Sequence, residues 1–122
     1  GHAANAIRQL REEASRRPEL NEILQPFVDE HASLSADLCL AVSGNADTPP
    51  NLTAEAMRQR SNSLALRASQ ACLAASKGAG FVASHPASRL VAEAMFFLVW
   101  SCPQPVVLGN LRELACASNY EN

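Results

Sequence analysis

The sequence predicts an all-α fold, a four- to five-helix, up-and-down bundle. Three observations support this prediction. Apolar residues recur at helical spacing along most of the 122 residues. No stretch shows the sustained alternation that is typical of strands. Prolines and glycines divide the chain into segments of helical length with short connections, which favour antiparallel packing around one core.

The length of 122 residues fits one domain, which we expect to cover residues 3–122. Gly1 and His2 are interpreted as a vector remnant, because no initiator Met precedes them. The chain is therefore expected to be either a complete small protein or a piece excised from a longer one.

The first predicted helix covers residues 3–17 and ends before Pro18, because the residue before a proline is pushed out of the α region. Pro26 is expected early in a second, longer helix, where its missing N–H does no harm. That helix reaches Ser43, and Gly44 supplies its C-terminal stop. The residues predicted to face inward from these two helices are Ile7, Leu10, Ala14, Phe27, Leu34, Leu38, Ala41 and Val42.

Thr53 is expected to cap a third helix over residues 54–76, in which Glu55 lies in the first turn and favours the helix dipole. Its inward residues become smaller toward the C-terminus, so neighbouring helices can approach closely and this helix is expected at the centre of the bundle. These inward residues are Met57, Leu64, Ala68, Ala71, Cys72 and Ala75.

A fourth helix is predicted from a cap at Ser84 to Trp100, with Pro86 in its first turn. It is apolar on nearly its whole circumference, which is typical of a helix buried on nearly all sides. Four neighbours of similar length would cover it only in part, so an outside partner is expected. A final helix over residues 106–117 is predicted to pack through Val107, Leu111 and Leu114.

Charge and cysteine usage exclude several classes of protein. The net charge of −2 and the pI of about 5.9 give no footprint for nucleic acid. The longest apolar run, residues 94–100, is far shorter than the ~20 residues that span a bilayer, so no membrane span is expected. The four cysteines lack metal spacing and lie in apolar contexts, which predicts buried free thiols and a reducing, cytoplasmic location.

No residue pattern predicts a self-sufficient active site or a metal site. His31 is interpreted as a surface histidine, and His85 as a local hydrogen-bonding group at a helix start. Glu93 is the carboxylate of the apolar region, but Arg89 lies one turn earlier, which favours an ion pair over a general base. The acids of the second helix are interpreted as a solvated face, namely Asp29, Glu30 and Asp37.

Two segments carry a family resemblance. Residues 74–81 read AASKGAGF and residues 89–94 read RLVAEA. In order and spacing they resemble the C-terminal helical domain of acyl-CoA dehydrogenases, where a Gln-x-x-Gly-Gly-x-Gly-aromatic segment ends an Ala-rich helix and an Arg-x-x-Arg-acid-Ala segment follows. The matching residues are Gly78, Gly80, Phe81, Arg89, Glu93 and Ala94, whereas the family's Gln, first Gly and second Arg fall on Ala74, Lys77 and Ala92.

The resemblance implies the C-terminal domain of an oxidoreductase of fatty acid metabolism, a flavoprotein whose FAD and acyl-CoA pocket this domain helps to build. It implies a homo-oligomer interface, and contact with the rest of the flavoprotein chain or with a neighbouring subunit. The family's catalytic Glu has no counterpart soon after Trp100, so this chain alone is expected to be inactive. The candidate cofactor-binding residues are Lys77, Gly78, Gly80 and Phe81.

Three alternatives remain open. The chain is similar enough to the same family to be the domain of a related flavin-dependent monooxygenase. It also fits a non-catalytic helical interaction and oligomerisation module, whose apolar ridge from Phe96 to Trp100 binds a protein. The third alternative is an unrelated bundle that binds a small molecule.

Overall fold

The computed structural model describes residues 1–44, 48–76, 86–100 and 102–117. Within these ranges the chain forms five α-helices and one turn of 3-10 helix, and none of the described residues lies in a strand. The all-α prediction is therefore confirmed for the described residues. The elements are α1 (His2–Arg16), η1 (Pro18–Leu20), α2 (Asn21–Ser43), α3 (Ala54–Ala75), α4 (Pro86–Trp100) and α5 (Gln104–Leu114).

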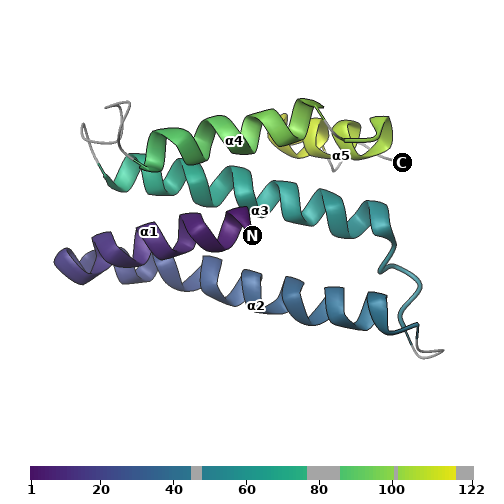
Figure 1. Cartoon of the computed structure of the whole chain (residues 1–122), viewed down its shortest axis with the longest axis horizontal. Coiled ribbons are helices and arrows are strands. Elements are labelled where there is room, and N and C mark those ends of the chain that lie inside the picture. Colours follow the sequence, from purple (N-terminus) through teal and green to yellow (C-terminus); the bar gives the residue numbers. More distant parts are fainter. Residues whose placement is uncertain (45–47, 77–85, 101, 118–122) are drawn as a thin grey trace.

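Helices α1 to α4 alternate in direction, and α3 lies at the centre of the arrangement (Figure 1). α3 contacts each of the other four α-helices, as its small inward residues predicted. α1 is shorter than α2 and α3, so it runs beside only one half of each of them (Figure 1). The other halves of α2 and α3 extend beyond its N-terminus.

The main core forms where α1 crosses the second half of α3. Leu10 and Ala68 have no exposed surface, and Cys72, Leu90 and Ala87 pack in the same cluster. The three predicted inward residues of α1 are buried, and so are the predicted inward residues of α3 apart from Ala71, which is half-buried. Periodicity therefore identified the buried face of α1 and one buried face of α3, but it missed Leu66, which packs against α4.

Two predicted caps are present. The Thr53 hydroxyl accepts a hydrogen bond of 3.1 Å from the backbone N–H of Ala56, which satisfies one free donor at the start of α3. Gly44 ends α2 in the left-handed region at φ 67°, where glycine has no steric penalty. α2 begins at Asn21, directly after the turn that Pro18 opens, so Pro26 is its sixth residue and removes one hydrogen bond inside the helix.

Two predicted packing faces were wrong. In the second half of α2, Leu38 and Val42 are exposed, because α1 does not extend far enough to cover them. In α5, Val106 and Asn110 are buried against α3, while Leu111 and Leu114 are exposed and Val107 is only partly buried. The buried side of α5 includes the polar Asn110, so apolar periodicity selected the other, more apolar side of the helix.

The cysteines are free, as predicted, but only one of them is buried. Cys72 lies in the core, Cys102 is half-buried, and Cys39 and Cys116 are exposed. The prediction of buried thiols was wrong for these last two because both lie outside the packed faces of the bundle. Cys39 is on the outward side of α2, and Cys116 follows the end of α5.

Candidate functional site

The most unusual surface of the described chain is the outer side of α4. Its inner side packs on α3 through Ala87, Leu90, Ala94 and Leu98, which are all buried. On the opposite side Phe96 is 53%, Val99 73% and Trp100 76% exposed. We call this surface the α4 face and define it as Ala92, Met95, Phe96, Val99 and Trp100.

The aromatic side chains at the C-terminal end of α4 contact one another. The rings of Phe96 and Trp100 stack, with centroids 5.7 Å apart and planes 18° from parallel. Phe97 meets Phe96 edge-to-face, with centroids 5.9 Å apart. Such contacts restrict the rotamers that Phe96 and Trp100 can adopt together.

The N-terminal half of α4 carries the polar residues. The Nε of Arg89 lies 3.5 Å from Oε1 of Glu93, which confirms the predicted ion pair. The other Glu93 oxygen lies 3.3 Å from Nδ1 of His2, whose Nε2 donates to the Leu90 carbonyl oxygen at 2.7 Å. Glu93 is almost half exposed and is held by two basic side chains, so the geometry supports a structural carboxylate rather than a general base.

A cavity of about 360 Å³ lies at the N-terminal end of α1, between α1, α2, α3 and α4. Its walls are mainly apolar, and the polar side chains are those of His2, His31, Ser35, Ser61 and Asn62. His31 is half-buried here, whereas a plain surface histidine was predicted. The Ser61 hydroxyl donates to the Met57 carbonyl oxygen, and among the described residues no hydrogen bond joins His31 to either serine. No nucleophile and base are therefore paired in this cavity.

Sequence reasoning missed a polar cluster between α3 and α5. Asn110 is fully buried, and its Nδ2 donates to the Gln59 carbonyl oxygen at 3.1 Å. Its Oδ1 accepts a hydrogen bond of 3.2 Å from Nδ2 of Asn62, which also lies 3.1 Å from the Cys102 sulfur. The sequence signal for this cluster was an asparagine inside an apolar helix segment. When such an amide is buried, it needs hydrogen-bond partners from other parts of the chain. The cluster fixes the packing face of α5.

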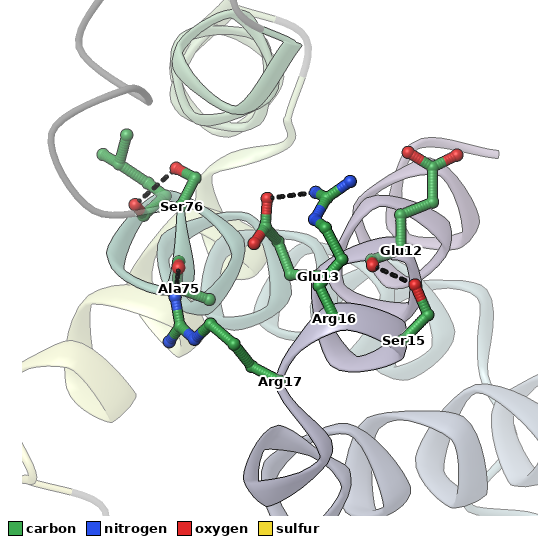
Figure 2. A network of polar contacts seen from close by, with 8 residues as sticks. Glu12, Glu13, Ser15, Arg16, Arg17, Ala75 and Ser76 are labelled. Atoms are coloured by element: carbon green, nitrogen blue, oxygen red, sulfur yellow. Dashed lines mark hydrogen bonds and ion pairs between the residues drawn. The ribbon is translucent and has the colours of Figure 1, made fainter.

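Glu13 of α1 lies beside the C-terminal end of α3, whereas Glu12 lies on the far side of α1 (Figure 2). Arg17 donates to the Ala75 carbonyl oxygen at 2.6 Å, and the adjacent Arg16 binds Glu13 at 2.7 Å. Burial raises the pKa of the Cys72 thiol to about 11, with smaller contributions from the charges of Glu13 and Glu12. Cys72 is therefore a neutral core group at physiological pH and not a nucleophile.

The acids of α2 are not simply solvated. The Asp37 carboxylate accepts a hydrogen bond of 2.7 Å from Arg60 of α3, and Glu30 binds Arg67 of the same helix. Asp29 remains exposed, as predicted, and accepts from Gln25. Two of the three carboxylates thus tie α2 to α3, a role that single-helix periodicity does not reveal.

The four candidate cofactor-binding residues, Lys77, Gly78, Gly80 and Phe81, lie outside the described residues, as does His85. Among the residues that the structure does describe, no group of three His, Cys, Asp or Glu side chains is placed to hold a metal ion. In the same part of the chain no helix is both long and apolar enough to cross a membrane.

Comparison of the chain with protein-family models, with curated proteins and with solved structures finds no match.

Proposed function

We propose that this chain is a non-catalytic helical interaction module, which assembles with a protein surface through the α4 face. The carrying observation is that Phe96, Val99 and Trp100 are half to three-quarters exposed on one side of a helix whose other side is fully packed. Contiguous apolar surface of this kind marks interaction sites in soluble proteins. The four free thiols support a reducing compartment, and we include a cytoplasmic location in the proposal.

The composition of the α4 face supports binding rather than accidental exposure. Trp and Phe are enriched at the energetic centres of interfaces, and charged residues are depleted there. In α4 the charged residues Arg89 and Glu93 lie toward the N-terminal end, and the last seven residues, 94–100, carry no charge. The stacked rings form a rigid anchor, which loses little conformational entropy when it is covered.

Photo-crosslinking in the cells that express the chain tests this function. We would replace Val99 by the photoreactive residue benzoylphenylalanine, and use the same replacement at the exposed Ala36 of α2 as the matched control. The proposal expects a discrete crosslinked species from position 99 and none from position 36. If position 99 gives no crosslink at native expression levels, the proposed function is wrong.

A second candidate function is the C-terminal domain of an acyl-CoA dehydrogenase-like flavoprotein or a related flavin-dependent monooxygenase. It is favoured by the packing of α4, which leaves a large apolar face for the other domains of a larger enzyme. The residues proposed for FAD lie outside the described part of the chain, and no described side chain is assigned to the cofactor. We therefore derive no catalytic step through FAD.

Flavin binding separates the two candidates. Isothermal titration of the chain with FAD tests this candidate, with Lys77→Ala and Gly78→Ala as variants. If the chain is a flavoprotein domain, we expect saturable binding of FAD, and we expect both substitutions to weaken it. The titration is repeated with the full-length parent protein. The absence of flavin binding to that protein would contradict this second candidate and leave the interaction module unaffected.

A further inference from the structure

We propose that the partner of the α4 face is a second copy of this chain, and that the two α4 helices pair antiparallel across a two-fold axis. This inference rests on the proposed function and names the partner of the same surface. It follows from the order of side chains along the outer side of α4, from the charge beside them, and from the area that they expose.

The outer side of α4 carries a regular seam, formed by Ser88, Ala92, Met95 and Val99. Their spacing of four, three and four residues is that of the packed positions in a two-stranded coiled coil. Ala92, Met95 and Val99 are exposed and Ser88 is partly so, which leaves the seam accessible from end to end. Three of the four residues are apolar, and the serine lies at the outer end, where its hydroxyl can keep contact with water at the rim of an interface. α4 thus has a second helix-packing stripe, which α3 does not use.

The spacing of the seam residues is the same from either end of the helix, but the sizes of their side chains differ between the two ends. When two copies run antiparallel, Ser88 of each copy lies opposite Val99 of the other, and Ala92 lies opposite Met95. Every contact then joins a small residue to a larger one, so the two helices can stay at an even distance along the whole seam. A parallel pair would place Val99 against Val99 and Ser88 against Ser88, which crowds one end and leaves a gap at the other.

The charge beside the seam favours the same direction. Arg89, Phe96 and Trp100 lie on one flank of the seam by their helical spacing, and matching flanks meet in an antiparallel pair. The Arg89 guanidinium, 71% exposed, then lies within a turn of the Trp100 indole of the second copy. A guanidinium over an indole is a favourable cation–π pair, and the two-fold axis forms this contact twice.

The exposed area is sufficient for a weak dimer. Phe96 and Trp100 at 53% and 76% exposure offer about 250 Å² together, since a covered aromatic side chain buries roughly 150–250 Å². Val99 and Met95 at 73% and 47% exposure add roughly 100 Å². Two copies thus contribute about 700 Å² from these side chains alone, and the small seam residues, the Arg89 stem and the backbone bring the total close to the ~1,000 Å² that a specific interface needs. We expect a dimer of micromolar affinity or weaker.

Sedimentation equilibrium of the purified chain, from about 1 µM to several hundred µM, tests the pairing. Ala92→Glu introduces two charges at the centre of the seam and should weaken dimerisation by more than tenfold. The matched control is Ala36→Glu, the same change at an exposed alanine of α2, which should leave the dissociation constant unchanged. Circular dichroism of both variants verifies that each remains folded.

Disulfide trapping tests the direction. In a background with the exposed Cys39 and Cys116 replaced by Ser, one preparation carries Ser88→Cys and a second carries Val99→Cys. An antiparallel pair gives the mixed 88–99 disulfide when the preparations are combined. Position 88 of one copy then lies opposite position 99 of the other, whereas 88 lies far from 88 and 99 far from 99. Disulfides of 88 with 88 and of 99 with 99, without the mixed species, would overturn the proposed direction.

The outcomes separate this inference from the proposed function. A chain that is monomeric at several hundred µM, or a dimer that Ala92→Glu leaves intact, overturns the second copy as partner. If position 99 still forms crosslinks to a different protein in cells, the interaction module stands and only the identity of its partner changes. If neither dimer nor crosslink forms, both proposals fail.

Discussion

Helices α1 and α4 both pack on the second half of α3, yet their outer sides differ completely. The outer side of α1 carries charged residues, among them Arg8, Arg11 and Glu12. The outer side of α4 has apolar residues along its last two turns, with Val99 and Trp100 mostly exposed. The inner sides of both helices are buried. Packing within the bundle therefore explains the apolar residues on the inner sides, but it does not explain those on the outer side of α4.

This difference separates residues that hold the bundle together from residues that the bundle leaves unused. Leu10 of α1 and Trp100 of α4 are both large and apolar, but Leu10 is fully buried while Trp100 is mostly exposed. The sequence predicts burial equally for both residues, because the hydrophobicity of a residue does not depend on which side of its helix has a neighbour. We therefore assign stability to the inner side of α1 and propose binding for the outer side of α4.

The largest expected effect is on the inner side of α1. Leu10→Ala removes a fully buried side chain from the main core and should lower the free energy of unfolding by about 2–5 kcal/mol, as measured by urea denaturation. Leu111→Ala in α5 is the control, since Leu111 is about half exposed and the change should cost less than ~1 kcal/mol. Equal losses for the two variants would mean that α1 does not seal the core.

Val106 of α5 is buried and Val99 of α4 is exposed, so the same substitution at the two valines compares a buried with an exposed position. Val106→Ser in α5 puts a hydroxyl where only 1% of the residue is exposed, and should cost roughly 2–4 kcal/mol of unfolding free energy. Serine has one side-chain heavy atom fewer than valine, so the loss combines a small cavity with the cost of the buried hydroxyl. A neutral Val106→Ser would contradict the packing of α5 on α3 through this face.

The polar cluster under α5 should contribute less. Asn110→Ala leaves the Gln59 carbonyl oxygen and the Asn62 amide without their buried partner, which should lower the unfolding free energy by about 1–3 kcal/mol. Asn62→Ala is the comparison, because Asn62 is only half-buried and water can replace part of what it loses. A larger loss for Asn62→Ala than for Asn110→Ala would indicate that Cys102, rather than α5, depends on this cluster.

The Cys72 thiol should make the stability of the fold depend on pH. Burial and the α1 glutamates raise its pKa from 9.0 in the unfolded chain to about 11 in the folded chain. Between these values the unfolded thiol ionises while the folded thiol stays protonated, so stability is complete below pH 9 and falls as the pH rises toward 11. The expected loss is on the order of 1–2 kcal/mol.

Urea titrations at about pH 8 and about pH 10.5, either side of the unfolded pKa, measure this loss, with Cys72→Ala as the control that removes the titrating group. The wild-type chain should lose more stability over this interval than the variant does. Alkylation at the lower pH gives an independent readout, in which the exposed Cys39 and Cys116 react and Cys72 reacts only after unfolding. Identical pH slopes for the two proteins would show that the thiol does not stay protonated in the fold.

Local signals gave much of the fold from the sequence. Thr53 and Gly44 were identified because their side-chain and backbone preferences act within one turn. The inward residues of α1 were identified because its apolar residues form a single stripe, whereas α3 is buried on more than one side and its buried Ser63, Leu66 and Ser69 were not predicted. The predictions failed where a neighbour decides the outcome. The exposure of Leu38 depends on how far the N-terminus of α1 reaches, and α5 packs through a side that includes the polar Asn110 rather than through its more apolar side.

The candidate site was predictable only in part for the same reason. The apolar ridge from Phe96 to Trp100 is visible in the sequence, but its exposure depends on the number and length of the helices around it. The role of His31 and of Asn110 depends on side chains that are far away in sequence, such as Asn62 for Asn110. No spacing rule within one helix contains that information.

The smallest expected effect is the most informative about the α4 face. Val99→Ser makes the same change as Val106→Ser, but at a residue that is 73% exposed, and should alter the unfolding free energy by less than about 0.5 kcal/mol. The measurement is made near 1 µM, where a weak dimer is dissociated. At several hundred µM the same variant should unfold at lower urea than the wild-type chain, because dimer formation stabilises only the folded form. If Val99→Ser costs as much at 1 µM as Val106→Ser does, Val99 belongs to the core of the monomer and the contrast between α1 and α4 fails.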